Sequence, residues 1–404
     1  MVSRIVFSLC VINYETPQPK TILLTTQTIA VLYVSPAYGQ QAQAPQTLDL
    51  RKAIEQVDAL AAGELATDNI GGITIGIVSG GKLVWTKSYG YADTEKKIPA
   101  SKDTVYRIAS ITKQFTALML LQLVEQGTVR LSDPVEKYLP EVNKLQKRFP
   151  SAPPITLVQL ATHTSGLDRE PDDDKLLYGT GPVSEWEKKL VATIPLTSYL
   201  YEPGTRYSYS NVGYAILGLA LSRAAGEPYV EYVQKRILKP LGMSQTAFSL
   251  DEGMQKNRAK GFLIENGKVD AETPELYERD GRGWRIPNGG LYSTVEDLAR
   301  FVAFELGAEN AAVLSKKTLE SNFVRVQSAN IDFSYGYGLG FQVRRRGNLV
   351  AVGHDGVLAG YQCSAWFDPK TRLGVVTMTT RLEKWLGLRA LEIIVNSGQT
   401  PDKK

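Results

Sequence analysis

The spacing of hydrophobic positions along the chain predicts which segments form helices and which form strands. Apolar residues recur at helical spacing in 49–69 and again in 110–126, where Gly127 supplies a typical helix stop. In 71–93 they alternate with polar residues on both sides of Gly80-Gly81. This alternation around two glycines predicts a β-hairpin with a two-residue turn.

The spacing of apolar residues predicts different elements in the middle of the chain and near its end. Most of the sequence in 131–285 indicates helix and loop, and farther on Ser293 and Glu296 have the spacing of a capping box. Alternating apolar segments return near the C-terminus, and an amphipathic helix closes the chain. The predicted later helices are 156–166, 210–226, 229–243, 293–307 and 383–397, and the predicted later strands are 338–346, 349–356, 361–369 and 373–380.

Strands at both ends of the chain, with helices between them, predict a mixed α/β (α+β) fold. We expect one antiparallel sheet, built from both chain ends and flanked by helices, with an inserted, mainly helical domain. The sheet domain would comprise 45–130 and 286–404, and the helical insertion 131–285. A catalytic cleft would lie between the two domains.

The first 44 residues differ in composition from the rest. The apolar, Thr-rich stretch TILLTTQTIAVLYV follows Lys20 and has about the length of the hydrophobic region of a signal peptide. Small residues in AYG (37–39) or AQA (42–44) fit a cleavage site. We therefore expect a signal peptide or leader over 1–44, a periplasmic or secreted protein, and no stable membrane span once the leader is removed. A single membrane anchor is the alternative, which the shortness of the stretch disfavours.

Composition and charge narrow the function classes. The 404 residues are 43% hydrophobic and 22% charged, as in an ordinary globular protein, and a formal net charge of +4 gives no reason to expect nucleic acid as a partner. Two histidines, and Cys363 as the single cysteine beyond the leader, make a poor ligand set, so we expect no metal and no cofactor. The segment 76–82 nearly matches a phosphate-binding loop, but Leu83 follows where Ser or Thr is needed.

Ser110 and Lys113 are the first candidates for chemistry. They are three residues apart at the head of the 110–126 helix, so both side chains project from one face, which continues as an apolar stripe. Burial of that face would favour the neutral amine of Lys113. A neutral lysine can accept the proton of a serine hydroxyl one turn away, which would activate Ser110 as a nucleophile without a histidine. Alone, the pattern also fits a helix N-cap beside a surface lysine.

Two further segments carry candidate residues. Tyr209 and Asn211 stand at the start of an apolar helix, where a phenol near a cation ionises more readily and can act as a base, and an amide can hold a substrate carbonyl. His354 and Gly356 lie at the end of a predicted strand, where a glycine lets a substrate backbone approach closely. Each of these residues, taken alone, could also be purely structural.

The three patterns S-x-x-K, Y-x-N and H-x-G occur in this order along the chain. With the stretches YRIASITK, LATHTSGL, PGTRYSYSNVGY, GGLYSTVEDLARF and GHDG, the sequence resembles the serine β-lactamase and penicillin-binding-protein superfamily. The similarity covers about 50–395 and is strongest to the branch of class C β-lactamases, D,D-peptidases and related esterases. It implies a β-lactamase/transpeptidase-like fold and a serine hydrolase that acts through an acyl-enzyme on an ester or amide.

The resemblance also implies residue roles. Ser110 would be the acylated nucleophile, and Lys113 and Tyr209 would share the proton transfers. The backbone N–H groups of Ser110 and Val357 would form the oxyanion hole. The residues that would bind substrate are Asn211, His354, Gly356 and Val357.

One departure from the family pattern is His354-Asp355-Gly356, which stands where many members have K-T-G. In β-lactamases the Lys and Thr of that motif help to hold the substrate carboxylate. If Asp355 faced the cleft, its charge would repel a carboxylate. We therefore expect esters, amides or peptides of D-amino acids to be better substrates than penicillins, with at most weak β-lactamase activity. Because neighbours on a strand alternate between faces, Asp355 could instead point away.

Other functions are open at this point. A low-turnover binding protein for penicillin or peptidoglycan peptides is the main alternative, and the complete S-x-x-K and Y-x-N patterns argue against it. A Ser-His-Asp hydrolase has less support, because no G-x-S-x-G pattern occurs and His163 in THTSG is better explained as structural. We expect a small-molecule or short-peptide substrate, and the sequence predicts no oligomeric state.

Overall fold

A computed structural model of the chain describes residues 50–397, except 68–69, 147–148, 174–177, 266–267, 309, 324–327, 330–333 and 382–384. The predicted leader over 1–44 lies outside the described residues and stays a prediction. Among the helices that are described, none has the length and apolar character needed to cross a membrane. The described chain forms a single unit, so the predicted domain boundaries stay a prediction as well.

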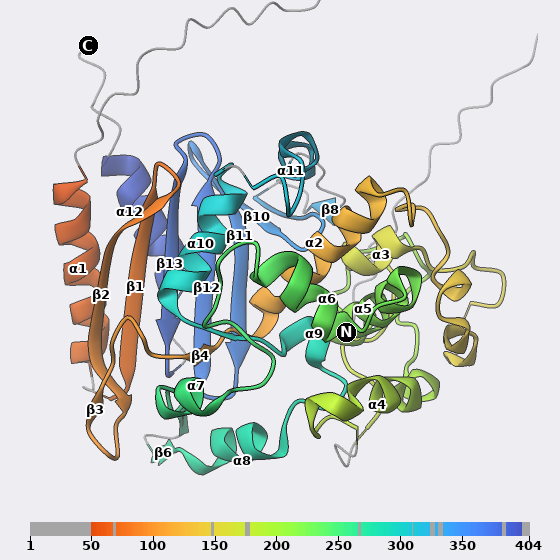
Figure 1. Ribbon diagram of the computed structural model, residues 1–404, viewed down its shortest axis with the longest axis horizontal. Helices are drawn as coiled ribbons and strands as arrows, with labels where there is room; N and C mark the ends of the chain where they lie inside the picture. Colours follow the sequence, from red (N-terminus) through yellow and green to blue (C-terminus); the bar gives the residue numbers. More distant parts are fainter. Residues whose placement is uncertain are drawn as a thin grey trace, which may run out of the picture. The chain divides into compact units, whose positions relative to one another are not determined.

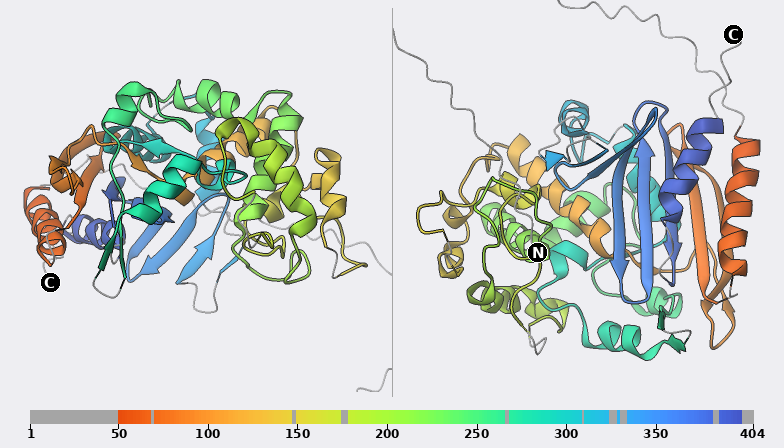
Figure 2. Two further views of the ribbon diagram at one scale, coloured as in Figure 1. Left: turned by 90° about the horizontal axis from the view of Figure 1, so that it is seen from below. Right: turned by 180° about the vertical axis from the view of Figure 1, so that it is seen from behind.

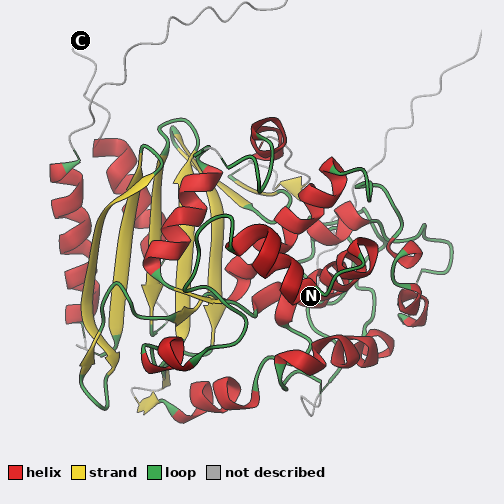
Figure 3. Ribbon diagram, in the orientation of Figure 1, coloured by secondary structure: helices red, strands yellow, loops and turns green. Residues whose placement is uncertain are grey.

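One antiparallel sheet is the centre of the fold (Figures 1 and 3). Its nine strands within the described residues lie in the order β3-β2-β1-β13-β12-β11-β10-β9-β8, so strands from the two chain ends meet where β1 pairs with β13. The predicted sheet built from both ends is confirmed. The strands are β1 (Gly72–Ser79), β2 (Lys82–Asp93), β3 (Ile98–Pro99), β8 (Ser328–Ala329), β9 (Tyr335–Tyr337), β10 (Gln342–Arg346), β11 (Leu349–Leu358), β12 (Tyr361–Asp368) and β13 (Leu373–Thr379).

Glycines at two tight turns let hairpins form, one of them the hairpin predicted over 71–93. Gly80 and Gly81, between β1 and β2, have φ values of +57° and +75°, as a two-residue hairpin turn of the mirror-image type requires. Gly347 has φ +56° at the turn between β10 and β11. A residue with a Cβ would be strained at each of these positions, so the turns follow from the sequence.

Two helices from opposite ends of the chain cover one face of the sheet. α1 (Arg51–Ala66) packs on β1 and β2, and α12 (Leu386–Ser397) packs on β12 and β13, with the two helices side by side (Figure 2, right). Ile73, Ile75 and Ile77 of β1 alternate toward this layer and are fully buried. Each apolar side chain removed from water in this way contributes about 1.5–3 kcal/mol to folding.

The other face of the sheet carries the helical part of the molecule. α10 (Val295–Glu305) packs on β1 and β13, and a Cβ at Gly76 would lie 2.9 Å from the Val295 side chain, so glycine permits this close contact. α2 (Thr112–Glu125) contacts both α5 (Asn211–Ala225) and α9 (Ile286–Gly289). These contacts bring the start of α2 next to the start of α5, which matters for the candidate site.

The remaining elements are short. The other α-helices are α3 (Leu157–Ala161), α4 (Trp186–Thr193), α6 (Tyr229–Val233), α7 (Glu252–Lys256), α8 (Glu272–Asp280) and α11 (Lys316–Phe323). Two small pairs of strands complete the described fold, namely β4 (Tyr106–Arg107) with β7 (Tyr292–Ser293), and β5 (Leu263–Glu265) with β6 (Lys268–Asp270).

Three predicted helices differ from the structure in length or capping. The helix predicted over 229–243 is α-helical only in α6 (Tyr229–Val233), which continues as a π-helix over Gln234–Leu238 and ends there. The helix predicted over 156–166 ends at Ala161, because the chain leaves helical geometry and reaches φ +57° at His163. The capping box predicted at Ser293 is wrong. Ser293 lies in β7 opposite Tyr106, and Thr294 caps α10 by accepting the backbone N–H of Asp297.

Candidate active site

Ser110 lies on a tight turn between β4 and α2. It belongs to a short 3₁₀ helix (Ala109–Ile111) that runs directly into α2, and Ala109 before it has φ +45°, which is uncommon for a residue with a side chain. β11 presses against this turn, since a Cβ at Gly356 would lie 2.0 Å from the backbone oxygen of Ile108. Only glycine fits there, so Gly356 fixes the sheet close to the serine.

Lys113 reaches three oxygen atoms from the first turn of α2. Its Nζ lies 3.1 Å from Ser110 Oγ, 2.8 Å from Asn211 Oδ1 and 3.0 Å from the backbone oxygen of Asn288 in α9. The side chain is fully buried. The structure therefore brings the predicted serine and lysine together and joins α2, α5 and α9 at one nitrogen.

Burial lowers the pKa of Lys113 well below its usual value. The charge of Glu170 opposes this shift, and the charges of Arg169 and Arg282 add to it. A neutral amine has two N–H donors and one lone pair. Its two carbonyl partners, on Asn211 and Asn288, can only accept hydrogen bonds, so the lone pair is left for the hydroxyl of Ser110. This is the arrangement in which Lys113 can take up the serine proton.

Tyr209 contacts the same two residues. Its hydroxyl lies close enough to Ser110 for that side chain to influence its pKa, and Lys113 Nζ lies 4.8 Å from the centre of its ring. Burial raises the pKa of Tyr209, and the effect outweighs the opposing influence of the Ser110 side chain and of the Arg169 charge. The sequence-based expectation of a readily ionised phenol is therefore wrong. Tyr209 is a neutral phenol here, which can donate a proton and receive another.

His163 supports Tyr209 from behind. The two ring centres are 4.1 Å apart, and His163 Nδ1 accepts the backbone N–H of Ser210 at 3.0 Å. The ring is fully buried, which lowers the pKa of His163 well below its usual value, so the imidazole is neutral. These contacts agree with the structural role expected for His163.

Asn211 begins α5 and links Lys113 to a carboxylate. Its Oδ1 accepts from Lys113 Nζ, and its Nδ2 donates to Glu170 Oε1. The residue before it, Ser210, caps the helix by accepting the backbone N–H of Gly213 at 2.9 Å. One N–H of the Asn211 amide remains for a ligand, because Nδ2 has two hydrogens and Glu170 takes one.

The strand β11 places its predicted residues on two different faces. His354 is buried, with Nε2 3.0 Å from the Tyr337 hydroxyl and Nδ1 2.6 Å from the Asp355 backbone oxygen. Burial lowers the pKa of His354 to about 3, so its imidazole is neutral. A neutral histidine whose two nitrogens are both occupied does not replace the cation of a K-T-G lysine.

Asp355 points away from the cleft. Its Oδ1 accepts from Ser364 Oγ at 2.7 Å and from Trp366 Nε1 at 2.8 Å, both on the neighbouring strand β12. Burial raises the pKa of Asp355, against the effect of these two hydrogen bonds. The expectation that Asp355 repels a substrate carboxylate is therefore wrong. This residue gives no reason for esters to be better substrates than penicillins.

A cleft of about 270 Å³ opens beside Ser110. Predicted residues line part of it, and a second group of polar side chains lines the rest. The lining residues are Ala109, Ser110, Arg169, Glu170, Asn211, Tyr277, Arg282, Arg285, Asn288, Gly289, Val357, Leu358 and Ala359. Val357 is 48% exposed there, and the oxyanion hole of its backbone N–H with that of Ser110 stays a prediction.

Sequence reasoning missed the polar wall of this cleft. Glu170 follows the LATHTSGL stretch, and Arg282, Arg285 and Asn288 precede GGLYSTVEDLARF, so all four flank segments that carried the resemblance. The available signal was the pair of arginines in GRGWRIPNGG, close together in a loop before a short helix. Nothing in the pattern alone indicated that this loop returns to Ser110.

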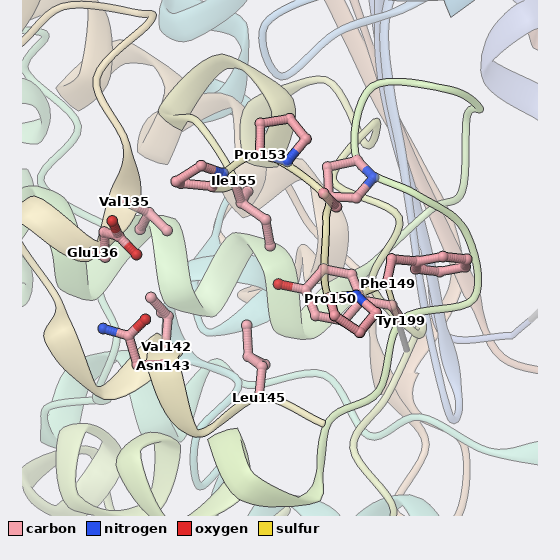
Figure 4. A pocket seen from close by; sticks show the side chains of 13 residues that line it. Val135, Glu136, Val142, Asn143, Leu145, Phe149, Pro150, Pro153, Ile155 and Tyr199 are labelled. Atoms are coloured by element: carbon pink, nitrogen blue, oxygen red, sulfur yellow. The ribbon is translucent and has the colours of Figure 1, made fainter. Parts of the chain in front are cut away.

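A second hollow, of about 80 Å³, is lined mainly by apolar side chains of 135–155, with Tyr199 and Pro203 (Figure 4). Its titratable side chains are Glu136 and Tyr199. None of its lining residues belongs to the Ser110 cleft. It offers no activated nucleophile, in contrast to the cleft at Ser110.

Curated proteins and solved structures resemble this chain along most of its length. It is 28% identical over 329 residues to Protein flp of Staphylococcus aureus (strain MRSA252), covering 80% of this chain and 62% of that protein. It is 31% identical over 372 residues to Beta-lactamase-like protein 4 of Dictyostelium discoideum, covering 85% of this chain and 63% of that protein. The chain thus spans a little over three fifths of the length of these relatives.

Among solved structures, the octameric penicillin-binding protein homologue from Pyrococcus abyssi has a TM-score of 0.72 at 27% identity, covering 87% of this chain and 78% of that one. A class C beta-lactamase has a TM-score of 0.73 at 18% identity, covering 89% and 100%, and shares the fold. The family model described as Beta-lactamase matches residues 55–394. The chain therefore belongs to the Beta-lactamase family, within the serine β-lactamase and penicillin-binding-protein superfamily.

Proposed function

We propose that this protein is a serine hydrolase that cleaves an ester or amide through an acyl-enzyme on Ser110. The observation that carries the proposal is the set of contacts at Lys113 Nζ. Two carbonyl oxygens occupy the N–H donors of the neutral amine, and Ser110 Oγ lies 3.1 Å away on the remaining side. A general base in this position is what nucleophilic attack by a serine requires.

In the acylation step, Ser110 Oγ bonds to the carbonyl carbon of the substrate and its proton passes to Lys113 Nζ. The carbonyl oxygen becomes an oxyanion, for which the backbone N–H groups of Ser110 and Val357 are the proposed donors. When the bond to the leaving group breaks, the departing oxygen or nitrogen needs a proton. Tyr209, a neutral phenol close to Ser110 and Lys113, would deliver it and then be reprotonated from Lys113.

In the second step, water replaces the leaving group. Lys113 accepts a proton from the water, the hydroxide attacks the acyl carbon, and the bond to Ser110 Oγ breaks as the proton passes from Lys113, through the phenol of Tyr209, to Ser110 Oγ. The products are a carboxylic acid and the free enzyme. Asn211, with one amide N–H left by its other contacts, supports the proposal as the donor that orients the acyl group.

The test is mass spectrometry of the protein after incubation with a fluorescent penicillin and, separately, with p-nitrophenyl butyrate. We expect an acyl adduct on the peptide that contains Ser110, together with release of p-nitrophenol. Ser110→Ala should abolish both, whereas Ser101→Ala, an exposed serine nearby, should abolish neither. An adduct on another residue, or ester hydrolysis that survives Ser110→Ala, would overturn the proposal.

The alternative function is a low-turnover penicillin-binding protein. The similarity to a penicillin-binding protein homologue supports this alternative. It predicts a penicillin adduct on Ser110 that persists for hours and no measurable turnover of esters. Hydrolysis of many ester equivalents per protein would exclude it.

A further inference from the structure

The cleft beside Ser110 contains more cationic than anionic groups. Arg169, Arg282 and Arg285 all line it, and Glu170 is the one carboxylate among its lining residues in the described part of the chain. Glu170 pairs with Arg285, with Oε2 3.1 Å from Nη2. This pair cancels one charge of each sign, so Arg169 and Arg282 remain as an excess of positive charge.

Arg282 is the most unusual of these residues. It is 93% buried, since its exposed fraction is 7%, yet no hydrogen-bond acceptor or carboxylate partner of its side chain is found in the described part of the chain, and its Nε is buried without one. A buried charge without a partner is costly, and in proteins such charges are almost always paired. The charge of Arg282 therefore needs a partner, and the described part of the folded chain does not supply one.

The carboxylate whose charge acts on Arg282, that of Glu278, already has other partners. Glu278 lies in α8, four residues before Arg282, but its two carboxylate oxygens accept both guanidinium donors of Arg107 and the hydroxyl of Tyr292. The Arg107–Glu278 pair is itself buried. Glu278 thus pairs with Arg107, and its charge offsets only part of the effect that burial, Arg107 and Arg285 have on Arg282.

Electrostatics agrees with this geometry. Burial, and then the charges of Arg107 and Arg285, lower the pKa of Arg282 to about 9. A guanidinium does not release its proton at neutral pH, so Arg282 remains charged in an unfavourable position. An anion that enters the cleft would relieve both the desolvation and the repulsion.

The segment 282–285, which carries Arg282 and Arg285, makes several close contacts. Arg285 stacks on Trp284, with its Cζ 4.5 Å from the ring centre, and its Nη1 donates to the backbone oxygen of Gly179 at 2.7 Å. Gly283 packs so tightly that a Cβ would lie 2.2 Å from the Tyr178 backbone oxygen. A cationic group with such fixed surroundings is suited to bind an anion without losing much side-chain freedom.

We propose that Arg282, with Arg169 and Arg285 beside it, forms a subsite for an oxyanionic group, a carboxylate or a phosphate, on the substrate of Ser110. This inference rests on the proposed hydrolase function and names the class of its substrate. The planar guanidinium recognises such groups through paired hydrogen bonds. The subsite belongs to segments 169–170 and 281–285 rather than to β11, where His354 is neutral and offers no cation.

The first test compares matched esters. For the wild type, we expect kcat/KM for p-nitrophenyl hydrogen adipate or p-nitrophenyl 6-phosphonohexanoate to exceed that for neutral p-nitrophenyl hexanoate by about ten- to a hundredfold, the effect expected of a charge-assisted hydrogen bond. The stronger of the two anionic esters distinguishes carboxylate from phosphate-type recognition. Arg282→Met should remove most of the preference. Arg279→Met, at a position 70% exposed, should keep it.

The second test does not depend on hydrolysis. Isothermal titration of Ser110→Ala protein with adipate and with inorganic phosphate should show binding of at least one anion, weakened by salt and lost in the Ser110→Ala, Arg282→Met double variant. Absence of ester hydrolysis with anion binding intact would overturn the hydrolase proposal alone. Equal rates for neutral and anionic esters, with no anion binding that depends on Arg282, would overturn the subsite and leave the hydrolase standing.

Discussion

Two buried basic side chains lie near the same serine, and they differ in the partners that the fold provides for them. Lys113 is surrounded by three oxygen atoms, from Ser110, Asn211 and Asn288. Arg282 has no acceptor for its side chain within the described residues. Lys113 is fully buried and Arg282 is 7% exposed, and burial lowers the pKa of both.

The two groups also differ in whether they can lose a proton when they are buried. An amine can give up its proton, so Lys113 becomes neutral, and its two N–H donors and one lone pair match its three partners. A guanidinium keeps its proton, so Arg282 remains charged and needs an anion from outside. Burial beside the same serine therefore enables Lys113 to accept a proton and enables Arg282 to bind an anion.

The largest effect should come from Lys113. Lys113→Ala removes the general base, and we expect the rate of acylation by p-nitrophenyl butyrate to fall by about a thousandfold. Lys113→Arg should fall as far, because a guanidinium keeps its proton and cannot accept that of Ser110. The burst phase of p-nitrophenol release measures this rate, and Lys235→Ala, at a site 60% exposed, serves as the control. A nearly active Lys113→Arg variant would show that charge rather than neutrality matters at this position.

The pH dependence should carry the signature of the same lysine. Below the lowered pKa of Lys113 the ammonium cannot accept a proton, so kcat/KM should fall by about tenfold per pH unit on the acid side and be constant above it. Burial lowers the pKa of His354 to about 3, so this histidine stays neutral even at a pH near the usual pKa of histidine. His354→Asn should therefore leave the position of the acid limb unchanged, and a limb that moves in this variant would assign it to the histidine.

A smaller loss is expected at Tyr209. Tyr209→Phe removes the phenol that relays protons but leaves Lys113 and its partners in place, so we expect kcat to fall by about a hundredfold. Tyr207→Phe is a matched control, because that hydroxyl pairs with Tyr335 at 2.6 Å instead of with Ser110. Equal losses in the two variants would mean that Tyr209 acts through the packing of the aromatic cluster alone.

The sequence predicted the fold well where the pattern is local. The hairpin at Gly80-Gly81 and the helix that follows Ser210 are specified by turn and cap residues within a few positions of each other. The errors arise where contacts distant in the chain decide the structure. Ser293 pairs with Tyr106 instead of capping a helix, and the chain turns at His163, where Ser210 and the surrounding tyrosine rings hold the imidazole.

The candidate site shows the same limit. Ser110 and Lys113 could be found because their spacing on one helix fixes their relation. The environment that decides protonation could not, since Arg282 and Asn288, which lies in α9, come from a segment more than 170 positions after Ser110 in the chain. For the same reason the ionised phenol expected at Tyr209 was wrong. Burial, which raises its pKa, is a property of the folded molecule.

The smallest effect, on stability, distinguishes the two buried basic side chains most directly. If Arg282 lacks a partner in the free protein, Arg282→Met removes a buried charge and should raise the free energy of unfolding by about 1 kcal/mol at neutral pH. Urea unfolding measures this change, and Arg279→Met should stay within about 0.5 kcal/mol of the wild type. Adding adipate should stabilise the wild type and not Arg282→Met, because an anion that binds only the folded state shifts the equilibrium toward it. A destabilised Arg282→Met would show that the guanidinium contributes to folding, and the contrast with Lys113 would fail.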